Sequence, residues 1–304
     1  MTIRDVTAGI DLGGTGTRIV LVGTDSQVAG QRTVATASLG DLGAPDQAVR
    51  ALAGHVSDVA GPGLRITAAG IGASGPVGAD GIIRNDDTLP AFSHFPVPET
   101  LSALLHAPCV IDNDAVTAAI GEYYHGAGRR AARLMMITLG TGVGVCVLNY
   151  GLPHRGGDGL HPEAGHLPVP GPPAPCYCGL PACWEQKASR TALGRGILAL
   201  PDAQGSIELA ASRARDGDPA AQDLFLRYGN DVGRGLGALS AIFRPDRIVI
   251  GGGAASYLDL FAPGIQQAIS RRHPFEVPAD LRAAGLGDLA GAIGAAEIAR
   301  NHPA

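Results

Sequence analysis

The sequence predicts an α/β fold made of two domains. Its 304 residues exceed what one compact core usually holds and suit two domains of roughly 100–200 residues each. Short apolar runs of strand length alternate with segments of helical periodicity, which is the pattern of α/β proteins with mixed sheets. A strand, a glycine-rich turn and a second strand occur in this order twice, at residues 7–23 and 135–148, and this repeat predicts two related halves.

The first half of the chain contains strands that end in turns or in polar residues. Residues 7–23 are predicted as strand, turn and strand, residues 45–60 as a helix, and residues 66–73 as a strand closed by a Ser-Gly-Pro turn. A loop over 81–98, a short helix over 99–106 and a strand over 109–111 follow, and residues 115–124 have helical spacing. We assign residues 1–115 to the smaller domain.

The second half repeats the opening pattern and then becomes mainly helical. After the strands of 135–148, residues 151–175 are rich in Gly, Pro and His and predict a loop. Residues 191–243 are predicted to be largely helical, residues 247–250 form a predicted strand, and a final helix covers 289–300. We assign residues 116–288 to the larger domain and expect the C-terminal segment 289–304 to return to the smaller one.

Charge and composition exclude several classes of function. The formal net charge of −5 provides no positive field for a nucleic acid. The N-terminus lacks a secretion-signal pattern, and no segment approaches the about 18 apolar residues of a membrane span. Five cysteines, three of them between residues 176 and 183, do not suit a secreted disulfide framework. We therefore expect a cytoplasmic protein with no nucleic-acid or membrane partner.

Two glycine-rich turns are candidates for phosphate binding. Their residues are Gly13, Gly14 and Thr15 in the first turn and Gly140, Thr141 and Gly142 in the second. Glycines let backbone N–H groups approach a phosphate closely, and threonine hydroxyls add donors. Asp11, at the strand tip before the first turn, can hold Mg²⁺ directly or through water. Either turn alone could equally be a structural hairpin, so it is the presence of two such turns in one chain that indicates phosphate binding.

A third glycine cluster, residues 251–253, follows the predicted strand 247–250. Gly252 and Gly253 could accept a nucleotide base or ribose by close backbone approach. The dinucleotide fingerprint is absent, because Ile19 stands where its third glycine would be. The only lysine, Lys187, is followed by Ala188 and has no glycine before it, which excludes a P-loop. No strand lysine supports a protein kinase.

A run of polar residues, Asp112-Asn113-Asp114, joins a predicted strand to a predicted helix. A carboxylate at a strand end points into whatever cleft those ends form, and burial there can raise its pKa until it accepts a proton from an alcohol. Asn113 could bind a hydroxyl of the same substrate. From the tripeptide alone, the helix N-cap is the better interpretation of Asp114.

Cysteine and histidine cluster in the second half. His166, Cys176, Cys178 and Cys183 provide three thiolates and one imidazole, the ligand set of a closed, structural Zn²⁺ site. The alternative is three free thiols. A hydrolytic zinc is disfavoured because no coordination position stays open, and the spacing of His161, Glu163 and His166 does not match H-E-x-x-H.

Together these segments resemble the ROK family, which contains bacterial sugar kinases and related sugar-responsive repressors. The resemblance covers nearly the whole chain, with order and spacing preserved. The matching motifs are the first turn with its Asp and Arg (11–18), Asn-Asp-Ala (113–115), the second turn (138–144), Glu-Ala-Gly-His (163–166), the cysteine motif through Glu185 (176–185) and the late glycine turn (248–253). The resemblance implies the two-domain actin/hexokinase-like (ribonuclease H-like) fold with a central cleft.

The resemblance also implies a role for each matching residue in an ATP-dependent sugar kinase. Asp114 would be the base for the sugar hydroxyl, usually the 6-OH. Sugar hydroxyls would be bound by Asn113, Glu163, His166 and Glu185. His166 would use one ring nitrogen for the sugar and the other for Zn²⁺. Asp11 would help hold Mg²⁺, and the two glycine turns would hold the phosphates of ATP.

Some positions depart from the family pattern. Pro162 and Ala182 replace glycines before Glu163 and Cys183. Thr88-Leu89-Pro90-Ala91-Phe92 stands where many family glucokinases have N-L-P-G-W, so an N-acetylhexosamine or another sugar or polyol is an alternative to glucose.

Three other classes compete with a kinase. A sugar-responsive DNA-binding repressor would need a helix-turn-helix before Asp11, where ten residues are too few. A zinc hydrolase is disfavoured because the predicted metal ligand set is closed. A sugar-binding protein without turnover is disfavoured by the presence of Asp114 and of both glycine turns. Polyphosphate stays open as a donor. The family resemblance suggests a homodimer or homotetramer.

Overall fold

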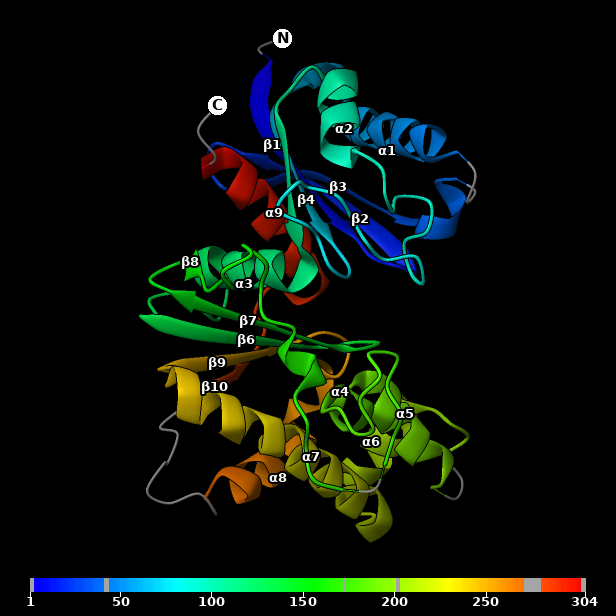
Figure 1. Ribbon diagram of the computed structural model, residues 1–304, viewed down its shortest axis with the longest axis vertical. Coiled ribbons are helices and arrows are strands. Elements are labelled where there is room, and N and C mark those ends of the chain that lie inside the picture. The colour runs from blue at the N-terminus through cyan, green and yellow to red at the C-terminus, as the bar shows by residue number, and fades with distance from the viewer. Residues whose placement is uncertain (1–2, 41–43, 172, 201–202, 271–279, 302–304) are drawn as a thin grey trace. The chain divides into compact units, whose positions relative to one another are not determined.

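The computed structural model describes residues 3–40, 44–171, 173–200, 203–270 and 280–301. The chain divides into two compact units: residues 1–130, 151–162 and 285–304 in unit 1, and residues 131–150 and 163–284 in unit 2. This division differs from the boundaries expected from sequence. The helix after Asn113 stays with unit 1, and the stretch 151–162 returns to it. Each unit has a sheet of its own (Figure 1).

Unit 1 is built on a five-stranded sheet of order β3-β2-β1-β4-β5. Its strands are β1 (Arg4–Leu12), β2 (Gly16–Gly23), β3 (Val28–Ala35), β4 (Leu64–Ala73) and β5 (Cys109–Asn113). Its helices are α1 (Pro45–Ala60), α2 (Val97–Leu105), α3 (Asp114–His125) and α9 (Ala290–Asn301). The helix predicted over 45–60 is confirmed, and so are the helices predicted near 99–106, 115–124 and 289–300, with small shifts at their ends.

Strand alternation decides which helix covers which face of this sheet. Val6, Ala8, Ile10 and Leu12 of β1 pack with α1 and α2 in one core. Gly9, on the opposite face, lies so close to α9 that an added Cβ would stand 1.9 Å from the carbonyl oxygen of Ala292. The small residues of α9 therefore let this helix pack directly on the sheet (Figure 1).

One buried carboxylate fixes two distant segments of unit 1. Glu122 on α3 is fully buried. Its Oε2 accepts from the backbone N–H of Ala127 at 2.7 Å and of Gly285 at 2.9 Å, and its Oε1 accepts from Leu286 N–H at 2.8 Å. These bonds satisfy a charge that would otherwise be costly to bury. They lie next to residues 130 and 285, where the chain leaves unit 1 and finally returns to it.

Unit 2 contains strands in the order β10-β9-β6-β7 and most of the helices. The strands are β6 (Arg133–Leu139), β7 (Val143–Asn149), β9 (Arg247–Gly251) and β10 (Asp280–Ala283), and the two-residue β8 (Leu152–Pro153) follows β7 in the chain. The helices are α4 (Glu185–Ala188), α5 (Arg190–Leu198), α6 (Ile207–Arg215), α7 (Pro219–Phe243) and α8 (Leu258–Ser270). The core joins the sheet to α7 and includes the fully buried Trp184, which donates to the Asp231 carbonyl.

The two sheets share one topology, which confirms the predicted repeat. In unit 1, β1 is antiparallel to β2 and parallel to β4, and β4 is parallel to β5. In unit 2, β6 is antiparallel to β7 and parallel to β9, and β9 is parallel to β10. The glycine turns therefore occupy equivalent positions, each between the first two strands of its sheet.

Candidate active site

The first glycine turn connects β1 to β2 in unit 1. Its Gly13 N–H donates to the Gly16 carbonyl at 3.3 Å, and the Thr36 hydroxyl donates to the Gly13 carbonyl at 2.6 Å. Gly14 lies against Thr88, since a Cβ at position 14 would stand 2.9 Å from the Thr88 Cβ. The turn therefore contacts Thr36 at Gly13 and Thr88 at Gly14. Because position 14 is a glycine, no side chain there covers the backbone of the turn.

Asp11, at the end of β1, is the most perturbed carboxylate near this turn. Its side chain is 19% exposed and lies 3.6 Å from the Arg18 guanidinium. A Cβ at Gly291, in the first turn of α9, would stand 2.9 Å from the Asp11 Cγ. Burial raises the pKa of Asp11 to about 6; the attraction of Arg18 opposes this shift and the charge of Asp288 adds to it.

This shift predicts how Asp11→Asn changes stability with pH. Because the folded-state pKa lies above the unfolded value of 3.8, Asp11 stabilises the fold below pH 3.8 and loses that contribution as pH rises through about 6. We expect Asp11→Asn to raise the melting temperature at pH 8, with a smaller gain at pH 5, in magnesium-free buffer. Thermal unfolding at both pH values checks this, and an equal gain at both would contradict it.

At the start of α3, the residue that caps the helix and the residue predicted to act as the base are different residues. Asn113 is the N-cap: its Oδ1 accepts from the Ala115 N–H at 2.8 Å, and its Nδ2 donates to the Gly75 carbonyl at 3.0 Å. Asp114 is the first residue of the helix and is partly exposed. The capping role that the tripeptide alone suggested for Asp114 therefore belongs to its neighbour, and the amide predicted to bind substrate is engaged with backbone.

The loop that departs from the family pattern packs against the first turn. Asn85 orders it by accepting from the Thr88 N–H at 3.1 Å and donating to the Ser74 carbonyl at 2.8 Å. Phe92 is fully buried in the unit 1 core. Phe92 is therefore a core residue, and Thr88 is the departure from the family pattern that lies against the turn.

The second glycine turn, between β6 and β7, is linked to two predicted binding residues of unit 2. The Gly140 N–H donates to the Gly142 carbonyl at 3.1 Å. The Glu185 Oε2 accepts from the Val143 N–H at 3.0 Å and leaves no room for a Cβ at Gly142. A Cβ at Gly165 would stand 2.1 Å from the Val143 carbonyl oxygen, so the turn η3 (Ala164–His166) packs against the same residue.

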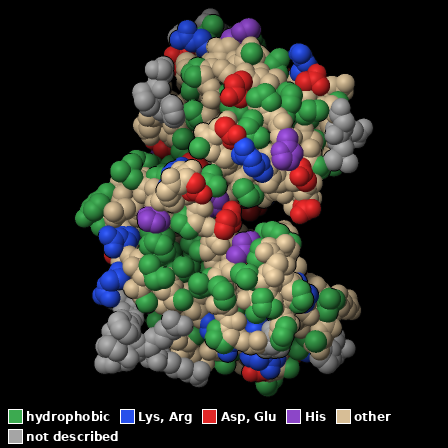
Figure 2. Space-filling model, viewed as in Figure 1, with side chains coloured by type: hydrophobic (Ala, Val, Ile, Leu, Met, Phe, Trp, Pro, Cys, Tyr) green, Lys and Arg blue, Asp and Glu red, His purple; other side chains and the backbone are tan. Residues whose placement is uncertain are grey.

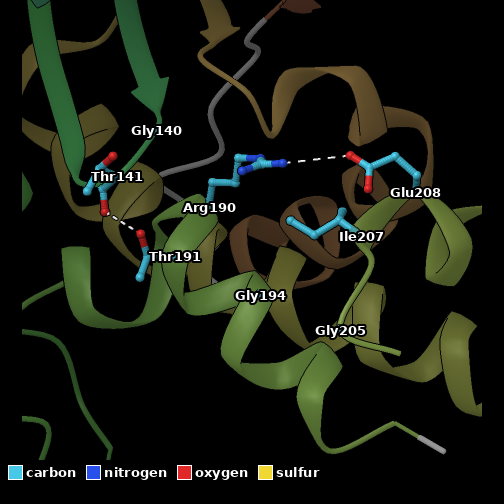
Figure 3. Close-up of a pocket in the computed structure, with 8 residues that line it drawn as sticks. All are labelled: Gly140, Thr141, Arg190, Thr191, Gly194, Gly205, Ile207 and Glu208. Atoms are coloured by element: carbon cyan, nitrogen blue, oxygen red, sulfur yellow. Dashed lines mark hydrogen bonds and ion pairs between the residues drawn. The ribbon is translucent and has the colours of Figure 1, made fainter. Parts of the chain in front are cut away.

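A pocket of about 260 Å³ opens beside this turn within unit 2 (Figure 3). Gly140 and Thr141 form one wall, and residues of α5, of α6 and of the turn between them form the others: Arg190, Thr191, Gly194, Gly205, Ile207 and Glu208. The Arg190 N–H donates to the Gly140 carbonyl at 2.9 Å, and the Thr191 hydroxyl donates to the Thr141 carbonyl at 2.9 Å. The start of α5 therefore holds the glycine turn in place.

Two charged side chains face each other in this pocket. The Arg190 guanidinium lies 3.7 Å from a Glu208 oxygen. Figure 3 draws this ion pair as a dashed line across the pocket. Glu208 also accepts from the Tyr257 and Ser206 hydroxyls, each at 3.0 Å. Hydrogen bonds from its own backbone N–H and from these two hydroxyls lower the pKa of Glu208. Gly253 adjoins the Arg190 side chain, and Gly252, with φ of +75°, packs against Leu139.

The four predicted metal ligands converge in unit 2. One ligand atom from each of His166, Cys176, Cys178 and Cys183 lies within 4.8 Å of all the others. The Cys178 and Cys183 sulfurs are 3.3 Å apart, and the Cys176 sulfur is 3.5 Å from the His166 Nδ1. Zn–S bonds of about 2.3 Å in a tetrahedron separate sulfurs by roughly 3.8 Å, so this donor set fits Zn²⁺.

The other histidine nitrogen points away from the cysteines. The His166 Nε2 shares a hydrogen bond of 2.9 Å with the Tyr177 hydroxyl. Burial raises the pKa of Tyr177, and the negative charges of Glu185 and Glu163 add to the shift. Tyr177 is therefore a hydrogen-bond partner of His166 whose pKa responds to the charges of two other predicted sugar ligands. Tyr177 was not predicted from the sequence, although its position between two predicted ligands could have indicated it.

Comparison with known proteins identifies the family. Residues 7–302 match the model of the ROK family. The chain belongs to the ROK family. It is 32% identical to the glucokinase of Streptomyces coelicolor, over 97% of this chain and 98% of that one. It is 33% identical to the N-acetylmannosamine kinase of an Escherichia coli O1:K1 strain, again over 97% and 98%.

Solved structures of ROK kinases have the same fold. A ROK family glucokinase from Streptomyces griseus, in complex with glucose and AMPPNP, has a TM-score of 0.82 and 31% identity over 98% of this chain and 100% of that one. The ROK hexokinase from Thermus thermophilus has a TM-score of 0.79 and 32% identity over 97% and 98%. The predicted actin/hexokinase-like fold is confirmed, and the predicted activity class, an ATP-dependent sugar kinase, is supported.

The predicted site residues fall into two groups. Unit 1 holds Asp11, Gly13, Gly14, Thr15, Asn113 and Asp114, and unit 2 holds Gly140, Thr141, Gly142, Glu163, His166, Glu185, Gly252 and Gly253. Arg190 and Glu208, which line the pocket, were not predicted. They belong to helices and carry no motif. Charges of both signs are interspersed over the face of the molecule in Figure 2, and no helix in the described parts of the chain is long and apolar enough to cross a membrane.

Proposed function

We propose that this ROK family kinase transfers the γ-phosphoryl group of ATP to the 6-OH of glucose or of a related hexose, with Asp114 as the general base. The observation that carries this proposal is the start of α3, where Asn113 caps the helix and the Asp114 carboxylate is not the cap. A carboxylate at this position can act as a base, and it borders the sheet end from which the first glycine turn also projects. The glucokinase relatives support the hexose.

In the proposed reaction, Asp114 accepts the proton of the sugar hydroxyl while the hydroxyl oxygen attacks the γ-phosphorus in line. The bond from that phosphorus to the bridging oxygen breaks, and ADP leaves with the electron pair. Backbone N–H groups of the two glycine turns, those of residues 14–15 and 141–142, would stabilise the charge on the transferred group. Closure around the sugar would exclude water, which would otherwise accept the phosphoryl group.

The sugar hydroxyls would be bound by polar side chains. Glu163, His166 and Glu185 would offer two carboxylates and an imidazole nitrogen to them. Asn113 has one amide hydrogen beyond those in its two bonds and would use it for the same purpose.

Two metal ions would assist. Mg²⁺ would be held by Asp11 and, when bound, would neutralise charge on the β- and γ-phosphates. Zn²⁺ would be held by His166, Cys176, Cys178 and Cys183, and its role would be structural, because four protein ligands leave no open position. With Nδ1 toward the metal, His166 would present Nε2 to the sugar, so the metal would fix the orientation of a sugar ligand.

The pocket beside the second turn would hold the nucleoside of ATP, with Gly252 and Gly253 near it. Its Glu208 carboxylate suits the hydroxyls of a ribose and repels a polyphosphate chain. The Arg190 guanidinium across the pocket offers a cation to a phosphate. The pocket therefore favours ATP over polyphosphate as the donor.

Glu208→Gln tests this assignment. Losing a charged acceptor for a ribose hydroxyl should raise the KM for ATP by roughly 5- to 20-fold and leave the KM for the sugar unchanged. Asp223→Asn is the matched control, since Asp223 pairs with Arg227 on the exposed face of α7 in the same unit. Initial rates over a range of ATP concentrations decide the matter. A KM for ATP within twofold of wild type would argue against a nucleoside in this pocket.

An N-acetylhexosamine is the second candidate substrate. The N-acetylmannosamine kinase relative is as similar to this chain as the glucokinases are. Thr88, shorter than the asparagine of many family glucokinases, lies at the first glycine turn and would leave more room there. The same catalytic groups would serve either sugar.

The experiment that tests the proposal is a sugar panel. ADP release would be followed with Mg-ATP and glucose, mannose, fructose, allose, N-acetylglucosamine, N-acetylmannosamine or an inositol, with Asp114→Ala in parallel. Turnover of one sugar that the variant abolishes would support the kinase and identify its substrate. Turnover of none, with the protein folded, would favour a sugar sensor without catalysis. Polyphosphate in place of ATP tests the donor.

We also propose that the protein works in the cytoplasm as a homodimer or homotetramer, without nucleic-acid or membrane partners. This rests on the family and on the state of the cysteines: the described residues include five free thiols and no disulfide. Sedimentation of the purified protein gives the assembly.

A further inference from the structure

An ion pair in unit 1 lies immediately before the proposed base. Asp112, in strand β5, uses its Oδ1 to accept from the Asn113 N–H at 2.8 Å. Its Oδ2 pairs with the guanidinium of Arg155. The Asp112 side chain is 14% exposed and that of Arg155 is 34% exposed. One carboxylate thus holds both the helix-capping residue and an arginine from a distant part of the chain.

Arg155 in turn braces a compact loop. Its Nη1 donates to the Gly159 carbonyl at 3.2 Å. Within the loop, the Gly156 N–H donates to the Leu160 carbonyl at 2.8 Å, and the Leu160 N–H donates to the Asp158 carboxylate at 3.1 Å. The guanidinium therefore connects β5 to a closed turn and does not hold the carboxylate alone.

The chain runs from this turn directly into a proposed sugar-binding residue. After Leu160 come His161, which is buried, then Pro162 and Glu163. Proline fixes its own φ and restricts the residue before it, so the segment from the turn through His161 to Pro162 has few conformations. The anchoring of the turn by Arg155 therefore constrains where the chain enters Glu163.

We propose that Asp112 and Arg155 are positioning residues for the sugar, acting as a tie between β5, the strand that ends just before Asp114, and the loop that leads to Glu163. This inference rests on the proposed function. Loss of the tie releases the loop without touching the proposed phosphate turns. Sugar binding should therefore suffer while ATP binding does not.

The environment of this pair distinguishes it from an ordinary surface ion pair. Exposed pairs usually contribute little. The Asp5–Arg65 pair of unit 1 is such a case, with side chains 39% and 67% exposed, although it has two short contacts. Asp112 and Arg155 are far less exposed and line a groove of about 390 Å³ with Asp80 and Glu99. Arg65→Ala is therefore a matched control.

The test compares Arg155→Ala, Arg155→Lys, Asp112→Asn and the double variant Asp112→Asn with Arg155→Ala. We expect Arg155→Ala to raise the sugar KM about 10- to 50-fold, with the ATP KM within twofold and an unchanged melting temperature. Lysine should restore only part of the loss, because its ammonium does not reproduce the planar fork that reaches two acceptors. The double variant should be no worse than Arg155→Ala, since the two residues act through each other.

Two results would overturn the inference. If the sugar KM of Arg155→Ala equalled that of the Arg65→Ala control, the Asp112–Arg155 pair would have no role in positioning the sugar. A parallel rise of both KM values with a lower melting temperature would make it purely structural. Wild type and Asp114→Asn are measured in the same assay: an inactive wild type refutes the proposed function and the inference with it, whereas an active, Asp114-dependent wild type with a silent Arg155 refutes the inference alone.

Discussion

Replacing Asp114 with asparagine should lower kcat for the preferred sugar by about 10²- to 10⁴-fold, the usual range for loss of a general base. Asparagine has nearly the same shape and can still accept a hydrogen bond from a hydroxyl, but it cannot take up the proton. Since Asn113 caps α3, the helix should start as before. We therefore expect the sugar dissociation constant, measured by calorimetry without ATP, to change by less than threefold.

The matched control for this change is Asp46→Asn. Asp46 also lies in the first turn of a unit 1 helix, α1, and is exposed. Its replacement removes the same charge from a helix N-terminus and should leave kcat within twofold of wild type. If Asp114→Asn retained a third or more of wild-type turnover, Asp114 would not be the base, and another carboxylate would have to be sought.

Removing the metal ligands should have the second largest effect. We expect the purified protein to contain about one Zn²⁺ per chain, and Cys183→Ser to contain almost none. Cys183 is fully buried, and its loss leaves the remaining thiols without the ion that would hold the segment 166–183. Because His166 would lose its anchor, the sugar KM should rise by more than tenfold, with a smaller change in the ATP KM.

Metal analysis and kinetics on the same samples check this prediction. Cys109→Ala is the control, since Cys109 lies in β5 outside the cluster, where burial raises the pKa of its thiol to about 12. It should keep its zinc and its activity. Chelation of the wild type should reproduce the Cys183→Ser kinetics, and added Zn²⁺ should reverse chelation but not the substitution. A zinc-free, fully active wild type would refute the metal site.

Much of the fold was predictable because its local signals agree. The helix over Pro45–Ala60 has a proline at its start and a regular apolar stripe. The repeated hairpins were visible through their glycines. By contrast, β3 was not predicted, since its residues Val28–Ala35 are mostly exposed and lack an apolar alternation. Helix α8 was missed as well, and Pro263 within it is a residue that ordinarily argues against a helix.

Site residues could be predicted where their chemical type alone indicates a role, as it does for metal ligands. They could not be predicted where tertiary packing determines the role. Three cysteines and a histidine indicate a metal without any structure. The roles within Asn113-Asp114 needed coordinates, because both residue types are good caps. The burial of Phe92 could not be read from a loop-like sequence. Arg155 gave no signal either, since its partner lies 43 positions away.

The buried Glu122 has a mechanical consequence. Its carboxylate holds the backbone at Ala127 and at Gly285, just inside the points where the chain leaves unit 1 and finally rejoins it. Displacing either segment pulls on the same carboxylate oxygen, Oε2, so the two segments cannot come loose one after the other. The residues after α3 and the segment at Gly285 therefore behave as one mechanical element of unit 1.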